Sequence, residues 1–212
     1  MRFREPGSSS GEYLSPMSKK PDPIIILASN SPRRRELLSQ IGLSFTTDPS
    51  DVDEQVQAGE LPESYAVRVA LDKARAAAAR AGKGIIIAAD TIVVLGNTLL
   101  GKPADRLDAE RMLSLLSGRM HVVITGLAII DVAEGKTVTG TSLTRVWFRD
   151  LSQDDITSYV KSGEPLDKAG AYGIQGKGAL FVRKIEGCYF NVVGLPLSLL
   201  GELLRNIGIR LF

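Results

Sequence analysis

The sequence predicts an α/β protein with a mixed β-sheet, lobed around a cleft, and two features of the chain indicate this fold class. Short apolar runs alternate with segments of helical periodicity in the first half of the chain. Pairs of strand-like segments joined by short turns indicate antiparallel hairpins as well. No internal repeat or linker interrupts this pattern, so we expect one domain over residues 23–212. Residues 1–22, rich in serine, glycine, proline and charge, are expected to form a disordered tail.

The first elements of the expected domain are a strand and two helices. Residues 24–28, IIILA, are typical of a short buried strand. A helix is expected to open at Ser31-Pro32, because serine can cap a helix and proline fits its first turn, and to end at Gly42. The alanine-rich segment 62–81 predicts a second, longer helix.

A continuous apolar run, residues 85–90, comes next and predicts a strand that is buried on both faces. Residues 91–100 are typical of a hairpin with Gly96-Asn97 at its tip. Residues 105–116 then predict a third helix.

The rest of the chain predicts a long antiparallel pair of strands, residues 121–131 and 137–148, joined by a short polar turn. A helix over residues 153–161 and a strand over residues 179–185 are expected to follow. Residues 196–207 have the pattern of a closing amphipathic helix.

Composition limits the classes of function. With 44% hydrophobic residues and a formal net charge of +2, the 212-residue chain has no overall charge that favours a nucleic acid or a membrane surface. One cysteine, Cys188, excludes an internal disulfide and a Cys-based zinc site, which suits a reducing cytoplasm. The single histidine, His121, argues against a Ser–His triad, and we expect it to be structural. No apolar run approaches about 20 residues, so we expect no membrane span.

The segment ILASNSPRRRELL, residues 26–38, concentrates positive charge where a strand ends and a helix begins. Unpaired backbone amides and the helix dipole already make this point positive. Ser29 and Ser31 add hydroxyls, and Arg33 and Arg34 add guanidinium groups that match phosphate oxygens. Phosphate binding, a solvated helix face and a nucleic-acid patch are the three alternatives for this segment.

Asp90 falls where the apolar run of residues 85–90 ends. Ligands of α/β proteins gather at the carboxyl ends of strands, and a carboxylate there can hold magnesium or activate a water molecule. The alternative is a cap of a helix or a turn, which aspartate often provides.

Three other charged residues give weaker signals. Lys102 lies between a glycine and a proline just after a strand, which would aim its side chain. Glu54 follows other acids in a loop, and Lys73 lies on a helix with other charges, so a solvated position is the expectation for both from the local pattern alone.

A glycine-rich segment, residues 164–181, carries Gln175. The order of its residues excludes a P-loop, and it does not follow a strand as a dinucleotide-binding fingerprint would. Because a glutamine amide both donates and accepts hydrogen bonds, Gln175 could read the edge of a nucleotide base.

The motifs LASNSPRRRELL, AADTIV, GKP, RMLSLLSG, SGEPLDKAGAYGIQG and NVVGLPL occur in the order of the Maf family of nucleoside triphosphate pyrophosphatases, and the chain resembles that family from about Ile24 onwards. The resemblance implies an elongated mixed sheet with flanking helices around a central cleft, similar to the inosine triphosphate pyrophosphatases. It also implies hydrolysis between the α- and β-phosphates of a nucleoside triphosphate. Asn30 and Ala89 depart from the usual family residues beside the site, without replacing a charged group.

The resemblance also assigns roles to residues. By motif match, the residues expected to hold the triphosphate are Ser29, Ser31, Arg33, Arg34, Lys73 and Lys102. Asp90 is expected to be the catalytic carboxylate and a metal ligand, with Glu54 as the second metal ligand. Thr91 and Gln175 resemble the subgroup that acts on dTTP and UTP. The implied cofactor is a divalent cation, magnesium with manganese as the alternative.

The implied partner is the nucleoside triphosphate substrate, with no specific nucleic acid and no membrane, in a cytoplasmic homodimer. The alternative function is a nucleotide-binding regulator of septum formation and cell division that hydrolyses nothing. A complete set of charged site residues favours the enzyme, because a protein that only binds would not need Asp90 and Glu54 together with four cations.

Overall fold

The computed structural model describes residues 23–211, and the expected tail, residues 1–22, lies outside them. The strands are β1 (Ile25–Leu27), β2 (Thr46–Thr47), β3 (Ile85–Leu95), β4 (Thr98–Leu100), β5 (Met120–Asp131), β6 (Lys136–Phe148) and β7 (Val182–Glu186). The α-helices are α1 (Pro32–Gln40), α2 (Pro62–Ala81), α3 (Arg106–Leu116), α4 (Gln153–Lys161), α5 (Tyr189–Val193) and α6 (Leu197–Asn206). Three 3₁₀-helices lie between α4 and β7, namely η1 (Glu164–Asp167), η2 (Ala169–Ala171) and η3 (Lys177–Phe181).

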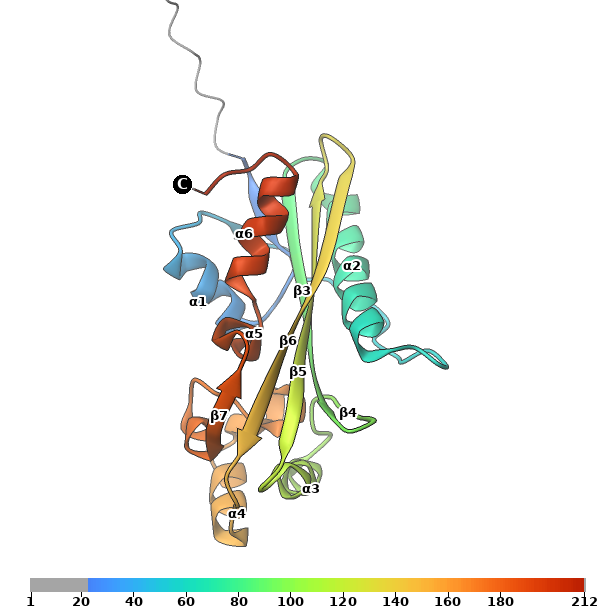
Figure 1. The fold of residues 1–212 in the computed structure, drawn as a ribbon. Helices are drawn as coiled ribbons and strands as arrows, with labels where there is room; N and C mark the ends of the chain where they lie inside the picture. The colour runs from blue at the N-terminus through green and yellow to red at the C-terminus, as the bar shows by residue number, and fades with distance from the viewer. Residues whose placement is uncertain (1–22, 212) are drawn as a thin grey trace, which may run out of the picture.

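All seven strands belong to one mixed sheet with the order β2-β1-β3-β5-β6-β7, and β4 pairs with β3. The strand β1 is parallel to both β2 and β3, whereas the remaining pairs are antiparallel. The three longest strands, β3, β5 and β6, run along most of the length of the molecule (Figure 1). The structure therefore confirms the predicted elongated mixed α/β sheet with flanking helices. The boundary of a single domain at residues 23–212 stays a prediction.

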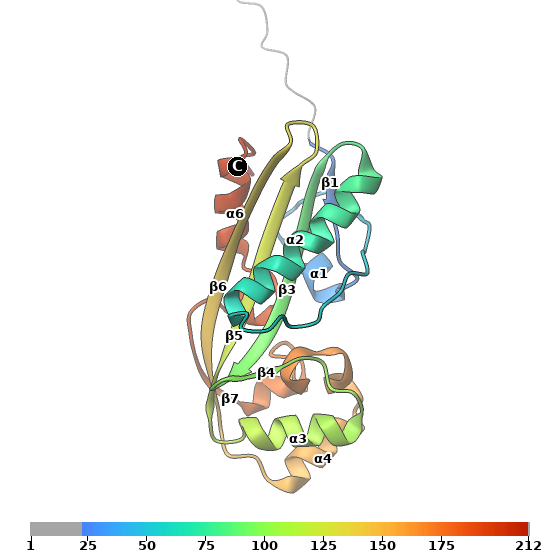
Figure 2. The ribbon, with the colours of Figure 1, turned by 90° about the vertical axis from the view of Figure 1, so that its right-hand side faces the viewer.

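Helices cover both faces of the upper part of the sheet (Figure 2). On one face, small side chains of α2, among them Ala70, Ala74 and Ala77, pack on Ile86 and Ala88 of β3. Small residues are needed because α2 lies very close to the sheet. At Gly126 of β5 even a Cβ atom would overlap the backbone of α2.

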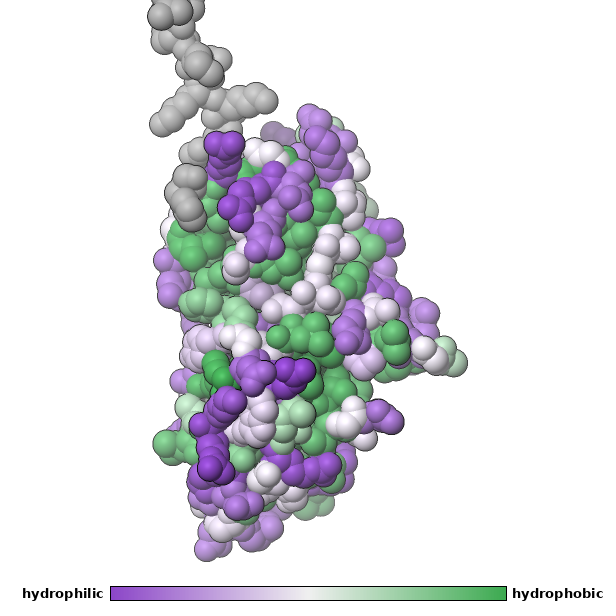
Figure 3. Space-filling model, viewed as in Figure 1, coloured by the Kyte–Doolittle hydropathy of each residue, from purple (hydrophilic) through white to green (hydrophobic). Residues whose placement is uncertain are grey.

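The other face of the sheet is covered by α1, α5 and α6, with buried leucines such as Leu37, Leu38 and Leu200 against β3. At the lower end, α3 and α4 pack with the 3₁₀-helices around Phe148 and Phe181 (Figure 2). Hydrophilic and apolar residues are intermixed over the face of the molecule shown in Figure 3. Within residues 23–211, every helix is too short or too polar to cross a membrane.

Two predicted strand boundaries are wrong. Asp90 does not end a strand, because β3 continues to Leu95 and Asp90 lies at its centre, paired with Gly126 of β5. The expected strand at residues 179–185 begins only at Val182, since the residues before it form the 3₁₀-helix η3. The short elements β2 and α5 were not predicted, because two- and five-residue segments carry too little periodicity.

One edge of β3 has different neighbours along its length. Residues 85–87 pair with β1 and residues 93–95 pair with β4. Between them, residues 88–92 have no strand partner on that edge among the residues that the structure describes. The site begins at this gap, with Asp90 in its middle.

Candidate active site

A cavity of about 400 Å³ opens beside the gap along β3. Its walls come from the start of α1, the loop before α2, the sheet-facing side of α2, the loop after β4, and the segment between η1 and η3. The structure brings every residue expected at the site to this one cavity: Ser29, Ser31, Arg33, Arg34, Glu54, Lys73, Asp90, Thr91, Lys102 and Gln175. Residues that are distant in the sequence therefore line a common pocket, while their roles stay a prediction.

Lys73 of α2 holds two carboxylates together. Its Nζ donates to Asp90 Oδ1 at 2.7 Å and lies 2.6 Å from Glu54 Oε1. The side chains of Lys73 and Asp90 are only 13% and 11% exposed, whereas that of Glu54 is 50% exposed. The local expectation of a solvated Lys73 is wrong, because α2 turns this residue towards the sheet between Ala70 and Ala77.

Arg34 connects α1 to the sheet from the other side of β3. Its Nη1 donates to Ser29 Oγ at 3.1 Å, its Nη2 to Thr91 Oγ1 at 3.0 Å, and its Nε to the carbonyl oxygen of Gly194 at 2.9 Å. Thr91 Oγ1 lies 2.9 Å from Thr125 Oγ1, which continues the network into the sheet. Burial lowers the pKa of Arg34, and the nearby Asp90 opposes this shift. A guanidinium group nevertheless keeps its proton in proteins, so Arg34 brings a fixed positive charge to the pocket.

The two serines of the strand-to-helix turn form internal hydrogen bonds. Ser31 caps α1, since its hydroxyl accepts a hydrogen bond from the amide of Arg34. Ser29 Oγ accepts from the amide of Ser31 at 3.2 Å as well as from Arg34. The serines therefore set the shape of the turn that presents α1 to the cavity.

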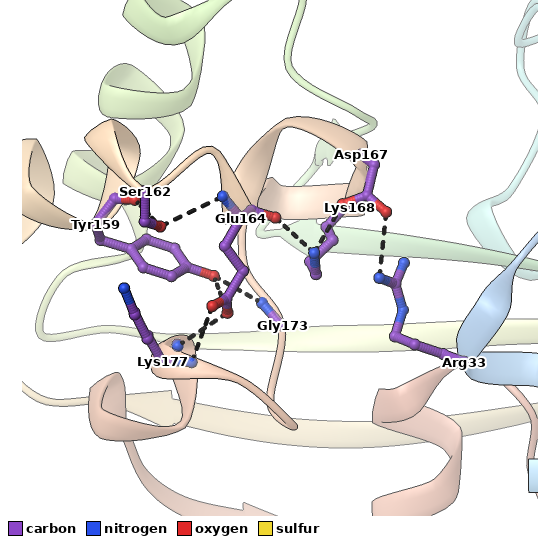
Figure 4. Close-up of polar contacts among 9 residues, drawn as sticks. Arg33, Tyr159, Ser162, Glu164, Asp167, Lys168, Gly173 and Lys177 are labelled. Atoms are coloured by element: carbon purple, nitrogen blue, oxygen red, sulfur yellow. Dashed lines mark hydrogen bonds and ion pairs between the residues drawn. The ribbon is translucent and has the colours of Figure 1, made fainter. Parts of the chain in front are cut away.

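Arg33 reaches across the cavity to the 3₁₀ segment. Its Nη1 lies 3.3 Å from Asp167 Oδ2, and Asp167 Oδ1 also accepts a hydrogen bond from Lys168 Nζ at 2.7 Å (Figure 4). Asp167 and Lys168 line the cavity but were not selected from the sequence. The signal that could have found them was their place in the same glycine-rich segment as Gln175.

Lys102 and Gln175 have free polar groups. Neither side chain forms a hydrogen bond or ion pair with the residues that the structure describes, and both are exposed at the cavity. Their donors, and the acceptor of Gln175, are available to a ligand.

The cavity thus combines five cations with four carboxylates. The cations are Arg33, Arg34, Lys73, Lys102 and Lys168, and the carboxylates are Asp51, Glu54, Asp90 and Asp167. Cations on several walls can neutralise a chain of phosphates, while the buried Asp90 can orient water or a metal-bound group. Across residues 23–211, no cluster of three or more His, Cys, Asp or Glu side chains could hold a metal by itself.

The profile of the Maf family, described as "Maf-like protein", matches residues 24–207. The chain belongs to the Maf family. Three Maf relatives are named "dTTP/UTP pyrophosphatase". The relative from Syntrophomonas wolfei is 50% identical over 86% of this chain and 96% of its own. The relative from Acetivibrio thermocellus is 50% identical over 87% of this chain and 96% of its own. The relative from Moorella thermoacetica is 51% identical over 87% of this chain and 95% of its own.

A solved structure, "The structure of the Staphylococcus aureus Ham1 protein", aligns with 86% of this chain and 98% of its own at 19% sequence identity, with a TM-score of 0.47. A similarity of this size supports no conclusion about function.

Proposed function

We propose that this Maf protein hydrolyses dTTP and UTP between the α- and β-phosphates, giving the nucleoside monophosphate and pyrophosphate. The observation that carries the proposal is the convergence of Arg33, Lys73 and Lys102 with Asp90 at one cavity. The names of relatives that are about 50% identical over nearly the whole chain support the same activity and substrates.

The cations perform the larger part of this reaction. Cleavage of a phosphoanhydride needs the triphosphate held in one geometry and the growing negative charge of the leaving pyrophosphate neutralised. Arg33 and Lys102 reach the cavity from opposite ends of the gap in the sheet, after β1 and after β4 respectively. A triphosphate between them would compete with Asp167 for Arg33, because both offer oxygens to the same guanidinium group.

Asp90 is the proposed catalytic carboxylate. It lies on rigid backbone in the middle of β3, and its Oδ1 is fixed by Lys73. In this position Asp90 can accept the proton of an attacking water molecule or orient that water. Lys73 also contacts Glu54, so one ammonium group sets the separation of both carboxylates.

Asp90 and Glu54 fit a divalent cation of the magnesium type. Magnesium is usually held by one or two carboxylates together with substrate phosphates, so a closed protein cage is not required. Magnesium is the proposed ion and manganese the alternative, and when bound it would supply positive charge to the phosphate oxygens. The chemistry of the two oxygen donors supports this fit.

Gln175 is the proposed reader of the base. Thymine and uracil share an N3–H donor next to carbonyl acceptors, and one glutamine amide can accept from the first and donate to the second. Cytosine offers an N3 acceptor next to an N4–H donor, so the amide would have to rotate by about 180° to pair with it. An amide held in the orientation that suits thymine and uracil would therefore favour dTTP and UTP over dCTP as substrates.

A panel of dTTP, UTP, dCTP, ATP and GTP with magnesium tests the function. We expect the fastest hydrolysis with dTTP and UTP. Tight binding of dTTP without hydrolysis would instead favour the non-hydrolysing regulator of septum formation. The homodimer, the cytoplasmic location and the lack of specific nucleic-acid binding remain predictions.

A further inference from the structure

Two side chains hold the two ends of the segment that carries Gln175, and Figure 4 shows their contacts with Gly173 and Lys177. We call residues 173–178, which follow η2 and include the first two residues of η3, the Gln175 loop. The two side chains are Tyr159 of α4 and Glu164 of η1. The proposed chemistry does not use either of them directly.

Glu164 binds the end of the Gln175 loop. Its Oε2 accepts a hydrogen bond from the backbone amide of Lys177 at 3.1 Å, and its Oε1 accepts from the amide of Gly178 at 3.3 Å. The hydroxyl of Tyr159 donates to the same Oε1 at 3.0 Å. One carboxylate therefore receives three hydrogen bonds.

Tyr159 binds the start of the loop. Its hydroxyl oxygen accepts a hydrogen bond from the amide of Gly173 at 3.1 Å while it donates to Glu164. The ring of Tyr159 is buried and packs edge-on against Phe181 with ring centroids 4.9 Å apart. The position of this hydroxyl is therefore fixed by the hydrophobic core around Phe148 and Phe181.

The glycines of the loop are explained by these contacts. A Cβ atom at position 176 would collide with the Glu164 carboxylate. A Cβ atom at position 178 would lie 2.8 Å from the Tyr159 hydroxyl and 2.7 Å from the carbonyl oxygen of Gly173. At position 178 the Cβ atom would meet backbone, and at position 176 it would displace the Glu164 carboxylate from its hydrogen bonds to the loop.

The electrostatics agree with this arrangement. Burial opposes the ionisation of Glu164, but the amide and hydroxyl donors outweigh burial, and the pKa of Glu164 is lowered. An ionised carboxylate accepts hydrogen bonds from amides more strongly than a neutral group does. The contacts to Lys177 and Gly178 are accordingly of the stronger kind.

We propose that Glu164 and Tyr159 are positioning residues that set the preference for thymine and uracil by holding the Gln175 loop around the Gln175 amide. The inference rests on the proposed function of Gln175 as the reader of the base. Gln175 lies between the anchored ends, lines the cavity, and has no side-chain hydrogen bond to the residues in the described part of the chain. A fixed backbone on both sides limits the positions from which the Gln175 amide can approach a base.

A double-mutant cycle tests the link to Gln175. The variants are Glu164→Gln, Gln175→Ala and their combination, with Asp154→Asn of α4 as control, because Asp154 is exposed and forms no such contact. The readout is the ratio of kcat/KM for dTTP to that for dCTP. We expect each single variant to lower this ratio roughly tenfold, mainly through KM for dTTP, and the combination to lower it no further. Multiplicative effects of the two substitutions would overturn the proposal, because Glu164 would then act independently of Gln175.

Hydrogen exchange tests the anchors without any assay of activity. In Glu164→Gln, the amides of Lys177 and Gly178 are expected to exchange faster than in the unchanged protein, while amides of β3 and β5 keep their rates. In Tyr159→Phe, the amide of Gly173 is expected to exchange faster than in the unchanged protein. Unchanged exchange at these amides would overturn the proposed anchors.

The two experiments separate the inference from the proposed function. If the unchanged protein hydrolyses none of the triphosphates, the proposed function fails. Hydrogen exchange then still tests whether Glu164 and Tyr159 hold the backbone of the Gln175 loop. If Glu164→Gln does not fold, Tyr159→Phe takes its place in the cycle, with the same expected lack of additivity with Gln175→Ala.

Discussion

The two halves of the cavity are built in different ways. Asp90 and Lys73 lie on a central strand and a long helix, and their backbone positions are fixed by regular hydrogen bonds and by the packing of α2 on the sheet. Gln175 lies on an irregular loop, whose position depends on single contacts from Tyr159 and Glu164. The groups proposed for chemistry are thus held by the fold itself, whereas the group proposed for base selection is held by a few side chains.

The largest expected effect is on kcat, and it follows from replacing Asp90 in the rigid half of the cavity. Asp90→Asn keeps the shape of the side chain but removes the charge and the proton acceptor, so we expect kcat for dTTP to fall by roughly 10²- to 10⁴-fold. Circular dichroism should show a folded protein. Asp131→Asn is the matched control, since Asp131 as a whole residue is as buried as Asp90 (9% and 8% exposed) but lies outside the cavity. An active Asp90→Asn variant would contradict the catalytic assignment.

Replacing the shared cation, Lys73, should lower the stability of the fold. Lys73→Met leaves Asp90 and Glu54 close together without the ammonium group between them. We expect the free energy of unfolding in urea to fall by about 2 kcal/mol, below the cost for a fully buried pair because Glu54 is half exposed. Lys83→Met, at an exposed position after α2, should change it little. Equal stability of the two variants would show that the Lys73 contacts are not needed by the fold.

The stability of the fold should depend on pH through His121, which contacts Tyr172 next to the Gln175 loop. His121 is buried, its Nε2 lies 2.8 Å from the hydroxyl of Tyr172, and burial lowers the pKa of His121 to about 3. The unfolded chain binds a proton at His121 below about pH 6.5, and the folded protein does so only near pH 3. Stability should therefore fall as the pH drops through this window, by about 2 kcal/mol between pH 7 and pH 5.

The matched measurement is urea unfolding of the unchanged protein and of His121→Gln at both pH values. The variant should lose less stability on acidification, because it lacks the group that must stay neutral in the fold. The same loss in both proteins would assign the pH dependence to other groups.

The smallest expected effect concerns Gln175, in the half of the cavity that is formed by the loop. Gln175→Ala should lower kcat/KM for dTTP and UTP by roughly tenfold and leave saturated turnover with dTTP close to normal, because the cations and Asp90 remain in place. Steady-state kinetics with dTTP and dCTP measure this directly. A large loss of kcat for both substrates would mean that Gln175 belongs to the chemistry and not to selection.

The sequence predicted the regular half of the molecule well. The helix at residues 62–81 and the tip of the hairpin at Gly96-Asn97 are confirmed, because alanine content and turn chemistry are local properties. The course of β3 through Asp90 could not be read locally, because an isolated charge in an apolar run looks like a strand end. The position of Asp90 within β3 depends on the neighbouring strands, because the unpaired stretch of this strand lies between its pairings with β1 and β4.

The site was predicted from the family resemblance more than from local pattern. For Lys73 the charges around it suggested a solvated residue, while its spacing from Ala70 and Ala77 on one helix face was the better guide. The role of Glu164 could not be predicted, because it depends on 3₁₀ turns that bring backbone amides 13 and 14 residues away to one carboxylate. Contacts of this kind follow from tertiary structure alone.

The most direct test of the proposed reaction identifies the products formed from dTTP with magnesium by the unchanged protein and by Asp90→Asn. The convergence of cations with Asp90 predicts dTMP and pyrophosphate in equal amounts from the unchanged protein, and almost no product from the variant. Release of orthophosphate with dTDP, or equal turnover by the two proteins, would contradict it.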